Sequence, residues 1–354
     1  MDLEGIKKEN SMFNDIESSW RHQIQEMYKC LLDREPEIEG LNYWVNELKN
    51  GIDISMVFNK LMGSDEYLLK ETQNQKQKVV KNQIIDFIKG KFTERQLIIV
   101  DVGAQNLSYE DHIYTPLIQH AFNTRVIGFE PLENGRKGLQ ESENSGSLSI
   151  FDTFIGDGNE YMFHINNQDA TSSLLPFNET VTDQLVGLSE IFTIKKKKIR
   201  SETLDNVLVE VEYIDLLKLD IQGFELKALQ NAKETLHKTS VIQCEVSFIE
   251  IYSGQALFAE VDLYLRSMGF QFIDFQYECR YPFHNKHALI SKDQLGWGDA
   301  IYLKKEPLKN EAESMLIQSL ISLICFNKIS LAASLIDRYK LLTGDIAFEK
   351  PNNL

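Results

Sequence analysis

The chain has 354 residues, of which 43% are hydrophobic and 10% aromatic, and its formal net charge is −16 at pH 7. This length and composition are typical of a globular protein with one large domain and a smaller one. Because so acidic a chain repels phosphate backbones and anionic lipids, the charge argues against nucleic acid and membrane surfaces as partners.

Cysteine spacing and hydropathy place further limits on the protein. The four cysteines, at positions 30, 244, 279 and 325, show no Cys-x-x-Cys spacing, so neither a zinc site nor a disulfide framework is indicated. The first seventeen residues lack the apolar core of a signal peptide. The longest apolar stretch, "MLIQSLISLICF", is too short to cross a bilayer. We therefore expect a cytoplasmic protein without membrane insertion.

Residues 1–75 predict a small all-α domain. Apolar residues such as Ile24, Met27 and Leu31 recur at helical spacing, and Gly51 supplies a helix stop. The segment contains no cluster of histidines, cysteines or convergent acids, so it is not expected to be catalytic. A polar, glycine-free stretch follows, and it predicts a linking helix over 76–94.

The pattern changes at Leu97, where β-branched apolar runs begin to alternate with helical patterns. This alternation predicts a doubly wound, Rossmann-like α/β domain over 95–307, with parallel strands joined by crossover helices. Its ligand crevice should lie beyond the carboxyl ends of the strands. The acids at or just after such ends are Asp101, Glu130, Asp157, Asp220 and Glu245. Residues 308–354 predict a C-terminal helical hairpin.

The run "LIIVDVGAQNL" ends a strand at a turn, and "VIGFEPL" ends the next strand. Gly103 permits a positive φ, Asp101 can accept a hydrogen bond from a ligand ammonium, and Glu130 can bind two vicinal ribose hydroxyls. We predict cofactor contacts at Asp101, Gly103, Ala104, Gln105, Glu130, Pro131 and Asp157. The alternative is a buried strand followed by a turn that contains one glycine.

The choice of cofactor depends on the glycines of this turn. A dinucleotide places its pyrophosphate against bare backbone, which is why three glycines recur in such turns. Here Gln105 and Leu107 stand where the second and third would be. S-adenosylmethionine carries no phosphate, so a site that binds it can hold Gln105 and Leu107 more easily. S-adenosylmethionine is therefore favoured over NAD.

Two further segments offer contacts for a ligand. Asp157, in "FIGDGNE", can accept from an adenine amino group, or it can belong to a plain Asp-Gly turn. Ser172 and Ser173, in "ATSSLLP", can contact cofactor or substrate, or they can cap a turn.

The most distinctive run is "IDLLKLDIQGFELKALQNA", whose strand ends at Asp220. Asp220 can orient a substrate hydroxyl or serve as its base. Glu225 opens a helix, where it can also complement the helix dipole, and Glu245 ends the following strand. We predict Asp220, Glu225 and Glu245 as the catalytic residues. Asp220 and Glu245 together are weak as a metal site, so no metal ligand is assigned. Four histidines lie in segments whose sequence is typical of loops or irregular structure: His112, His164, His284 and His287. None of them is ranked above the others as a base.

Taken together, these runs resemble the FkbM family of S-adenosylmethionine-dependent methyltransferases. The matching segments cover about 95–305 and are "DVGAQN", "GFEP", "SSLL", "RSETLDNVL", "KLDIQGFELKALQNA", "QCEVSFIEIYSGQALFAEVDLYLRSMGF" and "GWGDAIYLKK". The resemblance implies cofactor binding at Asp101, Gly103 and Glu130. It also implies a signature near the reaction centre at Lys218, Asp220, Gly223 and Glu225. Family members mostly methylate oxygens of sugars, glycans or small natural products, so a small-molecule or glycan acceptor is expected.

The first 75 residues resemble the phycobilisome-linker-like helical domain of unknown function that is appended to diverse bacterial proteins. This resemblance implies a bacterial origin and a role in binding a partner or in localisation. The terminal helical regions can also associate with a second copy of the chain. Two other functions stay open from the sequence: a non-catalytic interaction or scaffold protein with a degenerate cofactor pocket, and an NAD-linked sugar-modifying enzyme.

Overall fold

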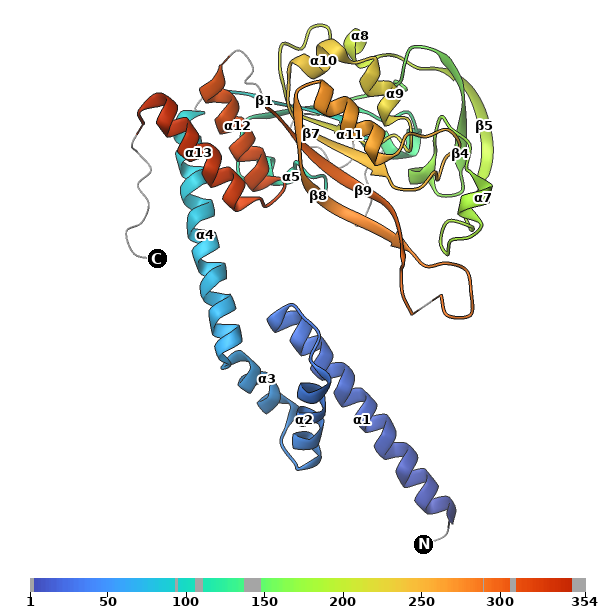
Figure 1. The fold of residues 1–354 in the computed structure, drawn as a ribbon, viewed down its shortest axis with the longest axis vertical. Helices are drawn as coiled ribbons and strands as arrows, with labels where there is room; N and C mark the ends of the chain where they lie inside the picture. The colour runs from blue at the N-terminus through green and yellow to red at the C-terminus, as the bar shows by residue number, and fades with distance from the viewer. Residues whose placement is uncertain are drawn as a thin grey trace. The chain divides into compact units, whose positions relative to one another are not determined.

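The structure, a computed structural model, describes residues 3–92, 95–105, 111–136, 148–288, 290–305 and 310–345, with the backbone alone over 3–14. The chain forms two compact units that divide between residues 82 and 83 (Figure 1). Within the described part of the chain, no helix has both the length and the apolar character needed to cross a membrane.

The N-terminal unit is all-α, as the sequence predicts. Its helices are α1 (Leu3–Leu32), α2 (Ile38–Lys49), α3 (Ile54–Met62) and the first part of α4 (Asp65–Lys91). Its core consists of Ile24, Tyr28, Leu32, Val45, Leu48, Val57 and Leu61. Asp53 caps α3 by accepting from the Ser55 amide at 2.8 Å. The stretch predicted as a linking helix is the second part of α4, which continues through residue 75 without a break.

A seven-stranded sheet forms the centre of the second unit. Its strand order is β3-β2-β1-β6-β7-β9-β8. The strands are β1 (Leu97–Val102), β2 (Thr124–Phe129), β3 (Leu148–Phe151), β6 (Ile214–Leu219), β7 (Thr239–Ser247), β8 (Phe270–Tyr281) and β9 (Gln294–Lys304). The five strands from β3 to β7 in this order are parallel. The expectation of parallel pairing fails for β9, which is antiparallel to β7 and β8. The reason is that β8 and β9 form a hairpin instead of a crossover.

Helices cover both faces of the sheet, which confirms the predicted doubly wound α/β class. They are α5 (Thr115–Gln119), α8 (Leu204–Val207), α9 (Glu225–Gln230), α10 (Lys233–His237), α11 (Phe258–Ser267), α12 (Glu311–Ile324) and α13 (Ile329–Thr343). Val100 and Leu217 are buried in a core shared with α9, α10 and α11. Side chains alternate along a strand, so the buried Ile99 and Leu216 point to the opposite face. On β6 and β7, α12 packs (Figure 1).

An antiparallel ribbon lies outside the main sheet. It consists of β4 (Glu160–Asn166) and β5 (Thr193–Arg200), and the connection between them contains the short helices η1 (Asp169–Thr171) and α7 (Glu179–Thr182). The lysines at 195–198 lie in β5 and are all exposed, which is usual for a run of like charges. The sequence suggests one strand through "SLSIFDTFIGD", but β3 ends at Phe151 and the chain then turns irregularly.

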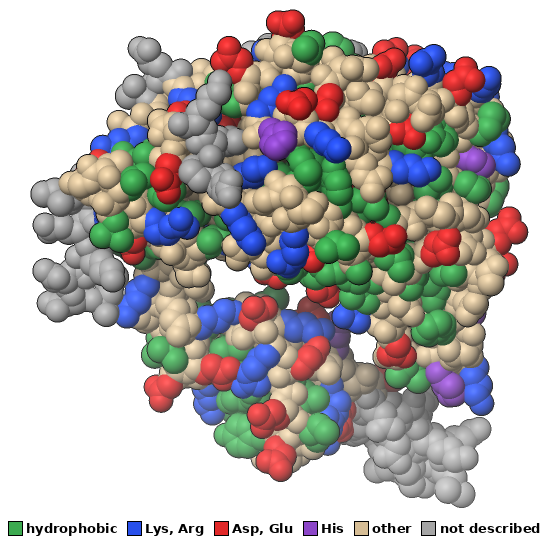
Figure 2. Space-filling model, turned by 45° about the horizontal axis from the view of Figure 1, so that its top comes forward, with side chains coloured by type: hydrophobic (Ala, Val, Ile, Leu, Met, Phe, Trp, Pro, Cys, Tyr) green, Lys and Arg blue, Asp and Glu red, His purple; other side chains and the backbone are tan. Residues whose placement is uncertain are grey.

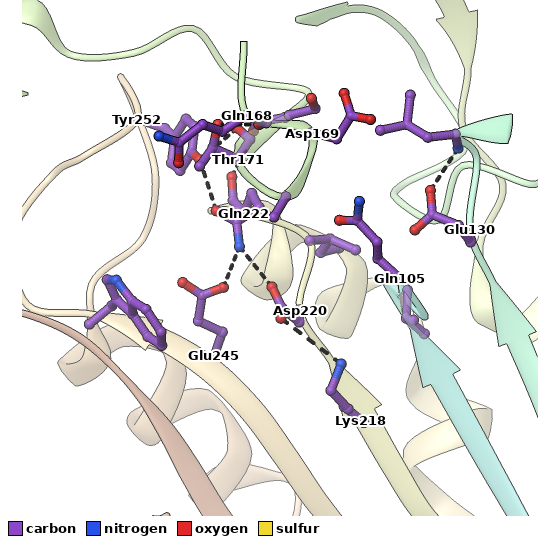
Figure 3. Close-up of a pocket in the computed structure, with 18 of the residues that line it drawn as sticks. Gln105, Glu130, Gln168, Asp169, Thr171, Lys218, Asp220, Gln222, Glu245 and Tyr252 are labelled. Atoms are coloured by element: carbon purple, nitrogen blue, oxygen red, sulfur yellow. Dashed lines mark hydrogen bonds and ion pairs between the residues drawn. The ribbon is translucent and has the colours of Figure 1, made fainter. Parts of the chain in front are cut away.

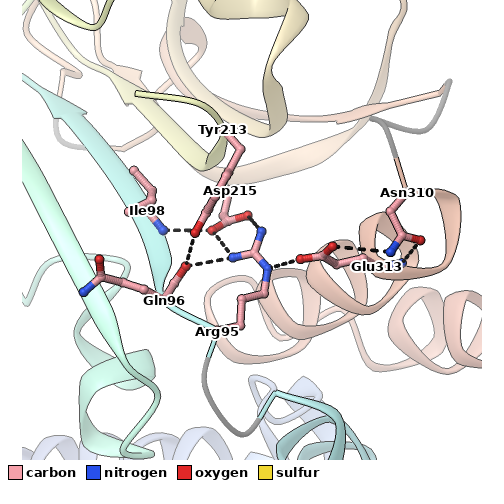
Figure 4. Close-up of polar contacts among 7 residues, drawn as sticks. All are labelled: Arg95, Gln96, Ile98, Tyr213, Asp215, Asn310 and Glu313. Atoms are coloured by element: carbon pink, nitrogen blue, oxygen red, sulfur yellow. Dashed lines mark hydrogen bonds and ion pairs between the residues drawn. The ribbon is translucent and has the colours of Figure 1, made fainter. Parts of the chain in front are cut away.

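A buried ion-pair cluster joins the C-terminal hairpin to the sheet (Figure 4). Arg95 donates two hydrogen bonds to the Asp215 carboxylate, at 2.8 and 2.9 Å, and a third to Glu313 of α12. Asp215 also accepts from the Ile98 amide at 2.8 Å. Residues far apart in the sequence therefore meet at the amino ends of β1 and β6, opposite the predicted crevice.

Acidic and basic side chains are not separated into different patches on the face drawn in Figure 2. On the face drawn in Figure 2, acidic and basic side chains are interspersed among apolar and uncharged polar ones. The large negative net charge therefore does not form a single acidic patch on this face.

Candidate functional site

A cavity of about 850 Å³ opens where the sequence places the crevice, beyond the carboxyl ends of β1, β2, β6 and β7. The strand order reverses at β1, which has β2 on one side and β6 on the other. In open α/β sheets this switch point leaves a crevice in which ligands bind. The cavity is therefore the candidate functional site.

The turn after β1 forms one wall of the cavity and depends on a glycine. Gly103 has a φ of +84°, and a Cβ added there would stand 1.9 Å from the Asp220 carbonyl oxygen. No other residue can lie so close to the end of β6. Ala104 is buried behind the turn, where it faces Gly128 and does not reach the cavity. Gln105 does line the cavity, whereas Leu107 lies outside the described residues (Figure 3).

Asp101 lies beneath this wall and does not line the cavity. Its wholly buried carboxylate accepts from Lys218 Nζ at 3.2 Å and from the Tyr114 hydroxyl at 3.0 Å, and His112 Nδ1 lies 3.4 Å away. Burial favours a raised pKa, but Lys218 and His112 outweigh it and lower the pKa of Asp101 to about 2. In this structure Asp101 is the counter-ion that holds Lys218, and the predicted contact with a ligand ammonium stays a prediction.

Glu130 and Pro131 line the cavity at the end of β2. The Glu130 carboxylate accepts from the Leu132 amide at 2.7 Å, and burial raises its pKa to about 7. A Cβ at position 135 would stand 2.8 Å from Glu130 Cγ, so Gly135 leaves the space that this side chain occupies. Among the described residues, no donor is hydrogen-bonded to the second carboxylate oxygen of Glu130. This oxygen can therefore accept from ligand hydroxyls.

Asp157 does not line the cavity. Its carboxylate accepts from the Tyr161 hydroxyl at 2.7 Å and from the Asn159 amide at 3.1 Å, and Gly158 follows with a φ of +86°. This is the Asp-Gly turn that the sequence left as the alternative. The cavity wall at this point is instead built by Thr153, Phe154 and Ile155, because the chain leaves the wall before it reaches Asp157.

Four side chains meet on the opposite wall of the cavity (Figure 3). Gln222 Nε2 donates to Asp220 Oδ1 at 2.8 Å and to Glu245 Oε2 at 2.7 Å. Gln222 Oε1 accepts from the Tyr252 hydroxyl at 2.8 Å. The structure therefore brings together Asp220 and Glu245, as predicted, and adds Gln222 and Tyr252, which were not predicted as site residues.

The backbone at Gln222 is in the left-handed region, with a φ of +56°. Such a conformation is uncommon for a residue with a side chain, and it persists where the surroundings impose it. Here the Ser173 hydroxyl donates to the Gln222 carbonyl at 2.6 Å. The position of glutamine between Asp220 and Gly223 in a distinctive run was the only signal in the sequence that could have pointed to it.

Asp220 and Glu245 differ in their surroundings. Burial, followed by the Asp220 charge, raises the pKa of Glu245 well above its ordinary value. Asp220 is more open, with 37% of its side chain exposed, and Lys218 Nζ lies 3.9 Å from its Oδ2. Burial disfavours the charged form of Lys218, but the carboxylates of Asp101 and Asp220 outweigh it and raise the pKa of Lys218 above its ordinary value. Burial and the neighbouring charge therefore favour the neutral form of Glu245, and Asp220 is the more exposed carboxyl of the two.

Glu225 lies behind the cavity wall instead of in it. Its carboxylate accepts from the Ile221 amide at 2.8 Å and from the Gly223 amide at 3.2 Å. Burial raises its pKa to about 7. Glu225 therefore holds the turn that carries Asp220 and Gln222, and the structure gives no contact for the catalytic role predicted from sequence.

The loop serines and the histidines are divided between the cavity and other places. Ser172 and Ser173 lie at the cavity edge, but their hydroxyls bond the chain itself, as in the turn alternative. His112 lines the cavity. The other three histidines do not: His164 is buried in β4, His284 bonds Ser189 at 2.7 Å, and His287 is exposed.

The charge of the cavity indicates which ligands fit it. Among its described lining residues, Lys218 is the only lysine or arginine. The acidic lining residues are Asp111, Glu130, Asp169, Asp220, Glu245 and Asp299. A phosphate would meet repulsion here, whereas a cation would be attracted. Within the described residues, no group of three or more histidines, cysteines and acids is arranged to hold a metal ion.

Two family models match parts of the chain, one within each unit. Residues 101–272 match the family described as the methyltransferase FkbM domain. Residues 11–70 match DUF4214, a domain of unknown function. Both matches fall where the sequence resemblances place them, and the resemblance to FkbM methyltransferases is confirmed.

Individual proteins are also similar to the chain. An S-adenosylmethionine-dependent methyltransferase structure from Anabaena variabilis has 9% identity and a TM-score of 0.31, over 63% of this chain and 84% of that one. A Listeria monocytogenes protein described as an S-adenosylmethionine-dependent methyltransferase has 9% identity and a TM-score of 0.32, over 64% and 99%. The 2-O-methyltransferase NoeI of Sinorhizobium fredii is 28% identical over 217 residues, which are 59% of this chain and 84% of that protein.

Proposed function

We propose that this chain, a methyltransferase with an FkbM domain over residues 101–272, uses S-adenosylmethionine as its methyl donor. The methyl group goes to a hydroxyl of a sugar, glycan or other small polyhydroxy acceptor. The observation that carries the proposal is the composition of one cavity. Glu130 and the Gly103 turn lie on one wall, and the linked side chains of Asp220, Gln222 and Glu245 lie on the other.

The residues on the β1–β2 side fit the cofactor. Glu130 would accept the two ribose hydroxyls, and Gln105 and Pro131 would border the adenosine. The scarcity of basic lining residues suits a ligand without phosphate, and the acids suit its positive charge. When bound, S-adenosylmethionine supplies an electrophilic methyl group on a positively charged sulfur.

The residues on the β6–β7 side would prepare the acceptor. Asp220 would receive the proton of the acceptor hydroxyl, because it is the more exposed carboxylate of the pair. Gln222 would hold Asp220 and Glu245 at a set separation. Positioning of the acceptor oxygen is the larger contribution, since well-oriented reactants can gain about 7–11 kcal/mol.

One relative supports the choice of an oxygen acceptor. NoeI is named a 2-O-methyltransferase, and its similarity extends over most of its length. The scaffold alternative needs a pocket that binds no cofactor, and the NAD alternative needs room for a pyrophosphate among carboxylates. The FkbM match and the charge of the cavity favour the transferase over both.

Calorimetry with S-adenosylmethionine and S-adenosylhomocysteine tests the proposal. Micromolar binding is expected, and Glu130→Ala should weaken it about 10–100-fold, the range for losing hydrogen bonds to a charged group. Asp157→Asn is the matched control, since the same sequence reasoning covers this residue but it lies outside the cavity. No heat with either ligand would favour the scaffold, and binding of NAD instead would favour the third alternative.

The acceptor is tested separately, with a labelled methyl donor. Surface-glycan fragments are the compounds to screen, with nucleotide sugars as phosphate-bearing comparisons that the charge of the cavity disfavours. Methylation of an oxygen supports the proposal, whereas transfer only to nitrogen or carbon acceptors contradicts it.

A further inference from the structure

The end of the cavity away from Glu130 is shaped by a bulge in β8. Phe275 pairs with Ala300 and Glu278 pairs with Gly298, so Gln276 and Tyr277 together face the single residue Asp299. All three of these residues line the cavity. A bulge re-aims the side chains that it carries, and here it directs two of them toward the site.

The Gly-Trp-Gly run of β9 completes this end of the cavity. A Cβ at Gly296 would stand 2.3 Å from the Tyr281 ring, and one at Gly298 would stand 2.8 Å from the Tyr277 carbonyl. Both glycines therefore let β8 approach closely on either side of Trp297. Trp297 Nε1 donates to the Tyr281 hydroxyl at 2.9 Å.

Tyr277, Tyr281 and Trp297 form an aromatic wall that lines the cavity. The Tyr277 and Trp297 rings lie 5.4 Å apart between centroids. Tyr277 is 54% exposed, so its ring is open to a ligand. An aromatic face is electron-rich, and it attracts the weakly positive C–H groups of a saturated ring.

Carboxyl groups stand beside the aromatic wall. Glu245 and Asp299 are directly paired between β7 and β9, and Glu245 is linked through Gln222 to Asp220. Lys218, the only lysine or arginine among the described lining residues, is already bonded to Asp101 at 3.2 Å. This end of the cavity therefore offers acceptors for hydroxyl groups and no basic side chain for an anion.

We propose that the aromatic wall is the acceptor subsite and that it selects an electrically neutral sugar ring, excluding rings that carry a carboxylate or phosphate. One face of the ring stacks on Tyr277 and Trp297, and its hydroxyls bond Asp299 and Gln276. The proposal rests on the proposed function, which it makes more specific.

Ligand-observed NMR and labelled-methyl assays test the subsite with the full chain. The panel consists of neutral hexose and N-acetylhexosamine oligosaccharides, each paired with its uronic-acid or phosphorylated counterpart. Neutral members are expected to bind and their counterparts to bind at least tenfold more weakly. Tyr277→Ala should weaken binding of the neutral glycan about tenfold, the size of a lost aromatic contact.

Tyr43→Ala is the matched control, because Tyr43 is 53% exposed and lies in the N-terminal unit. Neither substitution should change the affinity for S-adenosylmethionine, which also shows that the variant is folded. Asp299→Asn should narrow the difference between neutral and anionic members of a pair.

The outcomes separate the subsite from the function. Preferential binding of anionic members, equal effects of the two tyrosine substitutions, or binding of no neutral glycan would each overturn the subsite. If the unaltered protein does not bind S-adenosylmethionine, the proposed function itself is overturned.

Discussion

Replacing Gly103 with alanine tests whether the cavity wall requires a residue without a side chain. The added Cβ would stand 1.9 Å from the Asp220 carbonyl oxygen, and real Cβ contacts essentially never fall below 3.0 Å. The two backbones must therefore separate by at least 1.1 Å (3.0 − 1.9). The separation falls beside the hydrogen bond from the Asp220 amide to the Val102 carbonyl, which is 2.9 Å long.

Two terms set the expected loss of stability. A left-handed backbone costs a residue with a Cβ about 1–2 kcal/mol, and forced overpacking costs about 1–3 kcal/mol. Gly103→Ala should therefore lower the free energy of unfolding by about 2–5 kcal/mol. A shift of about 1 Å at Asp220 should also lower turnover about 100-fold in the protein that remains folded.

Gly254→Ala separates the steric clash from the backbone term. Gly254 has a φ of +78° with no atom within 4 Å of an added Cβ, so only the loss of about 1–2 kcal/mol is expected. Urea unfolding followed by circular dichroism measures both variants. Hydrogen exchange of peptides from β1 and β6 should rise only in Gly103→Ala. If the two substitutions cost the same free energy, the clash with Asp220 is not what requires glycine here.

Four further predictions concern the reaction, the cofactor and the stability of the fold. Asp220→Asn should lower turnover about 100–10,000-fold with unchanged S-adenosylmethionine affinity, and unchanged turnover would remove Asp220 from the mechanism. Burial raises the pKa of Glu130 to about 7, and the proposed ribose contact needs its ionised form, so cofactor affinity should be about tenfold weaker at pH 6 than at pH 8, with no such trend in Glu130→Gln. The same raised pKa affects stability in the opposite sense to affinity, because the folded protein binds this proton more tightly than the unfolded chain does. The free energy of unfolding that Glu130 contributes should therefore fall as the pH rises from about 4.5 to 7. Arg95→Met leaves the buried Asp215 without its partner and should cost about 3–5 kcal/mol in urea unfolding, most of it recovered when Asp215→Leu is added; no recovery would mean that the pairing is not what Arg95 contributes.

Sequence patterns were sufficient for features that depend on neighbouring residues. The β-branched run at Leu97–Val102 and the glycine after it identified the first strand and its turn, because strand formation and positive φ are local properties. Helical spacing likewise identified the N-terminal helices and the C-terminal hairpin. Acids at strand ends pointed to Glu130, Asp220 and Glu245, since parallel strands end on a common edge.

Which of those side chains enter the cavity was decided only by the tertiary structure. Asp157 and Glu225 lie a few residues beyond strand ends, whereas Asp220 follows β6 directly, and local hydrogen bonds turn both away from the cavity. Gln222 becomes the link between two carboxyls because its left-handed backbone aims its amide at both of them.

The antiparallel hairpin shows the same limit at the acceptor end. A sequence pattern reports that a segment is extended, but it does not report the register against another strand. The β8 bulge and the two glycines beside Trp297 act through that register, and they gather residues that are about twenty positions apart into one wall. Local chemistry therefore determined the elements and their ends, whereas pairing across the sheet determined what the cavity can bind.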